Sequence, residues 1–130
     1  MARPSSRHPT ELELEILKII WRDGPLSVRD VRDALAPARD LAYTSVMTIM
    51  NIMVKKGYLA RAKQEGRYFY RPRIAEQTMT RRILGDLVDR VFDGSTVAAM
   101  VNLLDAADID RAEIDRLRDL INRKAKEGAR

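Results

Sequence analysis

The sequence contains no cysteine and only one histidine. Without thiols there can be no disulfide, no thiolate metal site and no cysteine nucleophile, and one histidine cannot form a histidine-based metal cluster. The sequence also lacks a phosphate-binding glycine loop and any nucleophile beside a plausible base. We therefore expect no metal, no small-molecule cofactor and no catalytic residues, and a protein that is not an enzyme.

Long apolar runs are missing as well. No stretch approaches the roughly 20 consecutive apolar residues that cross a bilayer, and the first residues lack the apolar core of a secretion signal. We expect a cytoplasmic protein without membrane insertion. Its 130 residues suffice for one domain, or for a compact module with an appendage that a partner covers.

The net charge of +5 comes from one part of the chain. Residues 1–36 contain six basic and six acidic side chains, and residues 73–130 contain eleven of each. Residues 37–72 contain seven basic and two acidic side chains, which is the whole excess of five. Such a basic block is typical of a surface that faces a polyanion, and a merely solvated charged face is the alternative.

Two helices are predicted before the basic block. Thr10 and Glu13 form a capping box that starts the first helix, which ends at Asp23-Gly24-Pro25. Ser27 caps the second helix, and Pro37 stops it. The apolar residues recur at helical spacing and predict one buried face on each helix. These residues are Leu12, Ile16, Leu17, Ile19, Ile20 and Trp21 in the first, and Val28, Val31 and Leu35 in the second.

A third helix, predicted from about Ala42 to Lys56, has two chemically different faces when its residues are placed about 100° apart. The apolar face consists of Val46, Ile49, Met50, Met53 and Val54. The opposite face consists of Thr44, Thr48, Asn51 and Lys55, with Ser45 beside them. Short hydrogen-bonding side chains followed by a cation suit DNA better than they suit a core. Gly57 is the expected C-terminal cap.

A β-hairpin is predicted after this helix. Its strands are residues 58–63 and 67–71, and its turn is Gln64-Glu65-Gly66, with Gly66 in a left-handed conformation. Three helices followed by a basic hairpin predict a winged helix-turn-helix over residues 10–72, after a disordered arm at residues 1–9. In this fold the third helix enters the major groove, and the hairpin, called the wing, lies against the flanking backbone.

The predicted DNA-binding residues fall into two groups. Those expected at base edges are Thr44, Ser45, Thr48 and Asn51, and those expected at phosphates are Lys55, Lys56, Arg61, Lys63 and Arg67. Tyr43, at the start of the helix, completes the set. Asn51 is suited to pair with adenine through two hydrogen bonds, and a solvated asparagine is the alternative.

Residues 73–130 predict amphipathic helices from about Glu76 to Phe92, from Ser95, and from Asp110. The fold class is therefore mostly α with a small β-hairpin wing. A short segment with so much apolar surface cannot bury it well alone, so we expect a helical dimerisation domain of a homodimer. Folding back onto the winged domain in a monomer is the alternative. The predicted dimer interface consists of Ile83, Leu87, Val91, Val97, Met100, Val101, Leu104, Leu117, Leu120 and Ile121.

Several segments together carry a family resemblance. They are residues 13–21, Ser27 to Val31, Ala42 to Ile49, Lys55 to Leu59, and Gly66 to Pro72. Over Thr10 to Lys124 the chain resembles the BlaI/MecI family of penicillinase and methicillin-resistance repressors. The resemblance implies a transcriptional repressor that binds a palindromic operator in double-stranded DNA as a homodimer and controls a resistance or stress operon.

The resemblance also implies an induction mechanism, in which a membrane sensor protease cleaves within the dimerisation helices. Asn102 and Leu103 stand where the family usually has a scissile Asn-Phe pair, so leucine replaces phenylalanine here. Ile52 and Met53 stand where the family usually has Arg-Leu, which implies one lost contact to a phosphate or base. The residues alone also allow another function, a winged-helix interaction module whose basic hairpin docks an acidic protein partner.

Overall fold

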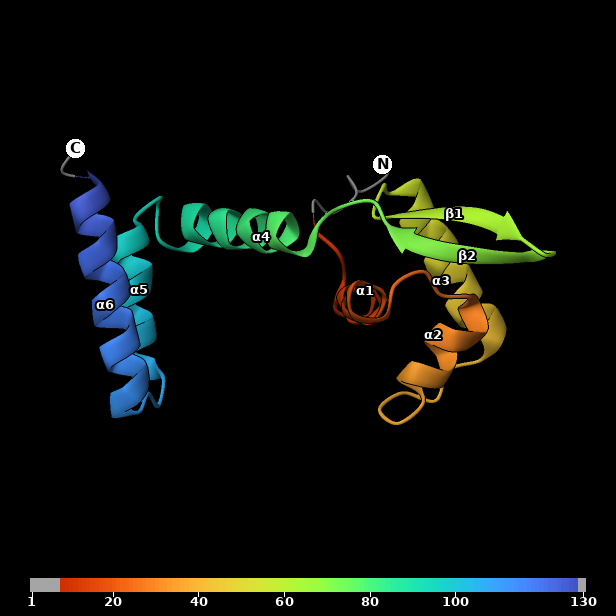
Figure 1. The fold of residues 1–130 in the computed structure, drawn as a ribbon, viewed down its shortest axis with the longest axis horizontal. Helices are drawn as coiled ribbons and strands as arrows, with labels where there is room; N and C mark the ends of the chain where they lie inside the picture. Colours follow the sequence, from red (N-terminus) through yellow and green to blue (C-terminus); the bar gives the residue numbers. More distant parts are fainter. Residues whose placement is uncertain (1–7, 129–130) are drawn as a thin grey trace. The chain divides into compact units, whose positions relative to one another are not determined.

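The computed structural model describes residues 8–128 and is mostly helical, with one antiparallel hairpin, as predicted (Figure 1). The expected disordered arm, residues 1–9, lies largely outside the described residues. The elements are α1 (Glu11–Asp23), α2 (Val28–Leu35), α3 (Tyr43–Lys55), β1 (Leu59–Gln64), β2 (Arg67–Pro72), α4 (Glu76–Val91), α5 (Thr96–Ala106) and α6 (Arg111–Gly128). None of the described helices has the length and apolar character that a membrane crossing needs.

The chain divides into two compact units, one ending at Leu84 and one beginning at Gly85. We call them the winged unit and the second unit. The winged unit contains α1 to α3, the wing formed by β1 and β2, and the first part of α4. The second unit contains the remainder of α4 together with α5 and α6.

Both predicted N-terminal caps in the winged unit are present. The Glu13 amide donates to Thr10 Oγ1 at 3.2 Å, and the Thr10 amide donates to Glu13 Oε1 at 2.8 Å. Ser27 forms the same reciprocal pair with Asp30, at 3.2 and 3.1 Å. Each box satisfies amides that the first helical turn leaves without a partner, so α1 and α2 begin where the sequence predicts.

One hydrophobic core holds the winged unit together. The predicted apolar face of α3 is confirmed, because Val46, Met50 and Met53 are fully buried, while Ile49 and Val54 lie at its edge. The same core receives buried side chains from α1, α2 and the wing. Burying one large apolar side chain contributes about 1.5–3 kcal/mol, so this face fixes which side of α3 remains exposed.

The wing has a tighter turn than predicted. Gln64 pairs with Arg67, which leaves a two-residue loop of Glu65 and Gly66, with φ of 52° and 78°. Two consecutive positive φ values are those of a type I′ turn, whose twist matches that of the strands. The left-handed Gly66 is confirmed, and the three-residue turn was wrong because Gln64 belongs to β1.

The winged unit extends past Pro72. Met79 of α4 is buried in its core, Ile74 and Ile83 pack against that core, and the Trp21 indole donates to the Ile74 carbonyl at 2.9 Å. Ile83, which the sequence placed in a dimer interface, is thus half-buried within the winged unit. The start of α4 completes the core that the three helices and the wing begin.

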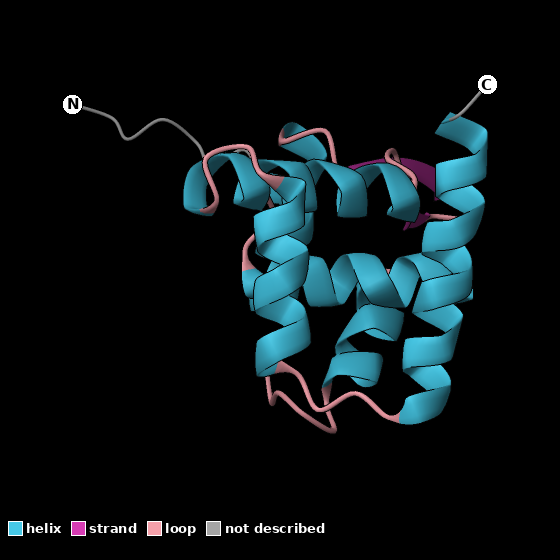
Figure 2. Ribbon diagram, turned by 90° about the vertical axis from the view of Figure 1, so that its left-hand side faces the viewer, coloured by secondary structure: helices cyan, strands magenta, loops and turns pink. Residues whose placement is uncertain are grey.

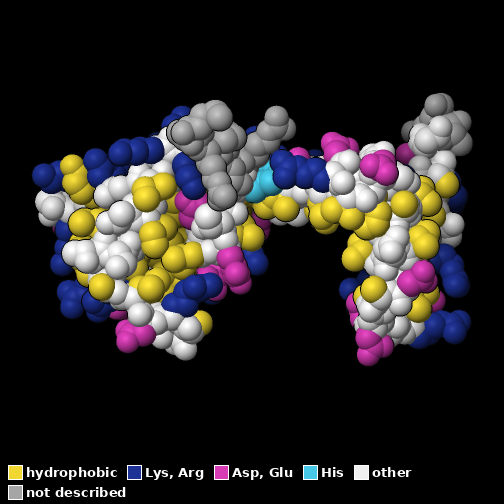
Figure 3. All heavy atoms as spheres, turned by 180° about the vertical axis from the view of Figure 1, so that it is seen from behind, with side chains coloured by type: hydrophobic (Ala, Val, Ile, Leu, Met, Phe, Trp, Pro, Cys, Tyr) yellow, Lys and Arg dark blue, Asp and Glu magenta, His cyan; other side chains and the backbone are white. Residues whose placement is uncertain are grey.

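The second unit has very little core of its own. Helices α5 and α6 run in opposite directions (Figures 1 and 2). Ala99 is the single buried residue described in them. An apolar groove of about 720 Å³ lies between the two helices, and apolar side chains reach the surface of this unit (Figure 3).

Candidate nucleic-acid interface

The exposed face of α3 carries most of the side chains predicted to contact base edges. Thr44, Ser45 and Thr48 are exposed, as are Tyr43 at the start of the helix and Lys55 at its end. The buried face lies opposite, so the helix presents these groups outward. The Thr48 hydroxyl donates to the Thr44 carbonyl at 2.9 Å, which leaves the Thr48 oxygen as an acceptor.

The C-terminal end of α3 is closed by a Schellman motif. The Gly57 amide donates to the Val54 carbonyl at 3.1 Å, and the Tyr58 amide donates to the Met53 carbonyl at 2.9 Å. Gly57 has a φ of 87°, which favours glycine. The predicted glycine stop is confirmed, and it sets where the chain leaves α3 for the wing.

The structure gives Asn51 partners that the sequence did not reveal. Its side chain is half-buried, and its Oδ1 accepts hydrogen bonds from Arg61 Nη1 and from the Tyr70 hydroxyl, each at 2.9 Å. Both partners belong to the wing, so Asn51 lies on the side of α3 that faces the wing. The register of the hairpin, which pairs Arg61 with Tyr70, is the signal that could have suggested this cluster.

One face of the wing combines cations with tyrosines. Arg61 is paired with Tyr70 and Lys63 with Tyr68, so the four side chains share a face. The Arg61 guanidinium lies 4.5 Å from the centre of the Tyr68 ring, and the Lys63 ammonium lies 5.8 Å from it. Contacts of this kind contribute about 0.5–1 kcal/mol at exposed sites and orient the cations. Arg67 is exposed next to the turn.

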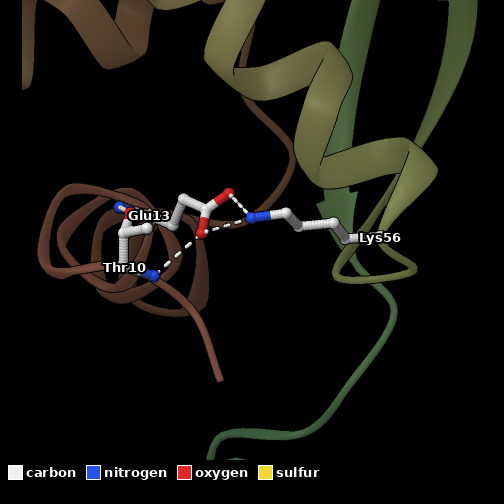
Figure 4. A network of polar contacts seen from close by, with 3 residues as sticks. All are labelled: Thr10, Glu13 and Lys56. Atoms are coloured by element: carbon white, nitrogen blue, oxygen red, sulfur yellow. Dashed lines mark hydrogen bonds and ion pairs between the residues drawn. The ribbon is translucent and has the colours of Figure 1, made fainter. Parts of the chain in front are cut away.

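Lys56, predicted to contact a phosphate, has a partner inside the protein. Its ammonium donates to both carboxylate oxygens of Glu13, at 3.1 and 3.0 Å (Figure 4). Glu13 is 3% exposed and also caps α1. Nearby, burial raises the pKa of Tyr58 above its usual value, and the Glu13 carboxylate adds to this effect. The ion pair of Lys56 with Glu13 joins the end of α3 to the start of α1.

A groove of about 320 Å³ lies between the start of α2, the start of α3 and the wing. Arg29 lines it together with the predicted residues Tyr43 and Arg67. Sequence reasoning missed Arg29, although α2 is the first helix of the helix-turn-helix and that helix crosses the DNA backbone. Ile52, where the resemblance expects arginine, is 41% exposed on α3.

These features define a class of protein. A three-helix core with a basic hairpin, and with a polar outer face on its third helix, is the winged helix-turn-helix of nucleic-acid-binding proteins. Within the described residues, no group of three or more His, Cys, Asp or Glu side chains is placed to hold a metal ion.

Comparison with known proteins gives the family. Residues 9–123 match the penicillinase repressor family, and the chain belongs to it. This is a family of DNA-binding transcriptional regulators and not of enzymes, and the match confirms the resemblance drawn from the sequence.

Curated relatives carry the names of the same family. The transcriptional regulator BlaI of Mycobacterium tuberculosis is 31% identical over 105 residues, which are 79% of this chain and 76% of the relative. The methicillin resistance regulatory protein MecI of Mammaliicoccus sciuri is 23% identical over 112 residues, which are 86% of this chain and 91% of the relative.

One solved structure shows a related protein with DNA. It is the monomeric form of Bacillus licheniformis BlaI in complex with the blaP half-operator, with 25% identity and a TM-score of 0.48. The similarity covers 56% of this chain and 89% of that one.

Proposed function

We propose that this protein is a cytoplasmic homodimeric repressor that binds a palindromic operator in double-stranded DNA and controls a resistance or stress operon. The observation that carries the proposal is the outer face of α3, where Thr44, Ser45 and Thr48 are exposed on the side opposite the buried residues Val46, Met50 and Met53. Family membership supports the same function. The winged unit, built on residues 10–72 and the start of α4, would bind the DNA.

In this proposal α3 lies in the major groove. The phosphates on either side would be contacted by cations that have no strong acidic partner among the described side chains, namely Lys55, Arg61, Lys63 and Arg67. We leave Lys56 out of this set because its ammonium pairs with Glu13. Arg29 joins the set through the groove that it shares with Tyr43 and Arg67.

The dimer would form through the second unit, whose apolar side chains lack cover. Val97 is 71% exposed and Leu103 is 64% exposed. An unpaired apolar surface of this kind usually marks an interface, and a second copy of the chain would fill the groove between α5 and α6. Two-fold symmetry of the dimer would then match a palindromic site. The predicted interface residues that are exposed in this unit are Leu87, Val91, Val97, Met100, Val101, Leu104, Leu117, Leu120 and Ile121.

Induction by a membrane sensor protease would act on the same unit. Asn102 and Leu103 are both exposed on α5, and the side-chain Nδ2 of Asn102 donates to the Ala98 carbonyl at 2.8 Å. Cleavage at this bond would cut α5, one of the two helices that line the groove, and so weaken the dimer.

A salt titration tests the proposal. The full chain is bound to a duplex selected from a random double-stranded library, and affinity is measured by mobility shift across salt concentrations. With the five cations named above on each chain, a dimer would neutralise about ten phosphates, and the log–log slope is about −9. A slope near zero, or a failure to enrich any sequence, would overturn the proposal.

A further inference from the structure

We propose that Asn51 is a positioning residue that fixes the wing and its Arg61 relative to α3, and that it does not read a base. The inference rests on the proposed DNA binding. It concerns how α3 and the wing, the two elements proposed to face DNA, are held relative to each other. It follows from three side chains on three elements, Asn51 on α3, Arg61 on β1 and Tyr70 on β2.

The Asn51 oxygen already has two donors. Arg61 Nη1 and the Tyr70 hydroxyl each lie 2.9 Å from it, and a carbonyl oxygen has two lone pairs. Because a guanidinium can only donate, its partner atom on Asn51 must be the oxygen and not the amide nitrogen. The acceptor capacity of this side chain is therefore used inside the protein.

Adenine recognition by Asn51 would need its Oδ1 atom, which already accepts two hydrogen bonds inside the protein. An asparagine that reads adenine accepts from the adenine N6 amine through its oxygen and donates to N7 through its nitrogen. Freeing the oxygen would leave the hydroxyl of Tyr70, which is 1% exposed, without this acceptor. Buried polar groups without partners are strongly disfavoured, so the internal contacts compete successfully with the base.

The contact also orients Arg61. Its guanidinium is bonded to Asn51 at one nitrogen and lies 4.5 Å from the centre of the Tyr68 ring. These two contacts restrict the long Arg61 side chain in the DNA-free protein, which reduces the conformational entropy lost on binding. A guanidinium has five N–H donors, so others remain for a phosphate at the junction of α3 and the wing.

The first test needs no DNA. Backbone ¹⁵N relaxation of the wing is measured in the full-length protein and in Asn51→Ala, Tyr70→Phe and Asn51→Asp. We expect increased motion of the wing in Asn51→Ala and a smaller increase in Tyr70→Phe. We expect no increase in Asn51→Asp, because aspartate keeps an acceptor for both donors. Thr48→Ala is the matched control on the same helix, since Thr48 bonds within α3. Unchanged wing motion in Asn51→Ala would overturn the proposal.

The second test uses DNA. The full-length protein and Asn51→Ala select sites from a random double-stranded library, and affinities are measured on the duplex that the wild type enriches. Asn51→Ala should bind about tenfold more weakly with unchanged base preferences, as expected when a hydrogen bond that orients a contact is lost. Arg61→Ala should then weaken Asn51→Ala far less than it weakens the wild type.

The outcomes separate this inference from the proposed function. If Asn51→Ala relaxes the preference at one base pair, or if its effect adds fully to that of Arg61→Ala, Asn51 reads a base and the positioning role is wrong. If the wild type enriches no sequence, the proposed function fails, and the relaxation measurement still decides whether Asn51 holds the wing.

Discussion

The winged unit and the second unit both contain amphipathic helices, but the apolar helix faces are buried in the first and exposed in the second. In the winged unit the apolar faces of α1, α2 and α3 meet the wing and the start of α4, and most of their large side chains are buried. In the second unit the apolar faces of α5 and α6 border an open groove. A helical face becomes a core only when enough other elements surround it, and the second unit has too few. The winged unit therefore completes its core within one chain, whereas the second unit leaves an apolar surface that a second copy would cover in the proposed dimer.

The largest expected effect comes from adding a charge to the exposed apolar surface of the second unit. Leu120 is 53% exposed on α6 and lines the groove. In a dimer, Leu120→Asp would remove two buried leucines at about 1.5–3 kcal/mol each, which raises the dissociation constant of the dimer by about 10²–10⁴-fold. Size-exclusion chromatography with light scattering should show a monomer at micromolar concentration.

The matched control for this variant is Asp119→Asn, which changes the neighbouring polar residue and should leave the dimer intact. A wild-type protein that is itself monomeric at micromolar concentration would contradict the comparison of the two units. So would a dimer that tolerates Leu120→Asp unchanged.

A smaller effect is expected inside the winged unit, at the ion pair of Lys56 with Glu13. Lys56→Ala leaves the buried Glu13 carboxylate without its cation and should lower the free energy of unfolding by about 1–3 kcal/mol, less than for a fully buried pair because the Lys56 side chain is 26% exposed. Urea denaturation of the full-length protein measures this change. The salt dependence of DNA binding should remain that of the wild type, because Lys56 does not contact phosphate in our proposal.

Lys55 provides the matched control because it is the adjacent lysine and is exposed. Lys55→Ala should change stability by less than about 0.5 kcal/mol, as is usual at surface positions, and should reduce the salt slope by about one for each copy of the chain. Equal stability of the two variants would show that the ion pair does not hold the winged unit together.

The smallest expected effect is a gain in stability at the turn of the wing. Glu65 has a φ of 52°, a conformation that asparagine adopts more readily than glutamate. Glu65→Asn should raise the free energy of unfolding by about 0.5–1 kcal/mol. Differential scanning calorimetry should show a higher Tm, whereas Gln64→Asn, one residue earlier in β1, should not. A lower Tm for Glu65→Asn would contradict the assignment of a type I′ turn.

Local patterns in the sequence were enough to predict much of the winged unit. The capping residues Thr10 and Ser27, the apolar face of α3 and the left-handed Gly66 are all confirmed. Each depends on residues within one helical turn or one β-turn, where backbone geometry fixes which side chains meet. The exposed positions of Thr44 and Thr48 follow from the same periodicity.

Pairings between distant residues could not be predicted in this way. Periodicity assigns a residue to a face but does not identify its partner on another element. Glu13 and Lys56 are 43 residues apart, and Asn51 and Tyr70 are 19 apart. For the same reason the sequence did not reveal that Met79 of α4 completes the core of the winged unit.

Glu13 has a consequence for anyone who redesigns this protein. Its one carboxylate serves two helix ends, since it caps the beginning of α1 and binds the ammonium of Lys56 just after α3. Glutamine at this position would keep the cap but lose the charge. Residues 13 and 56 must therefore be altered together, and a library that varies the end of α3 to change DNA preference should keep Lys56 constant or vary Glu13 with it.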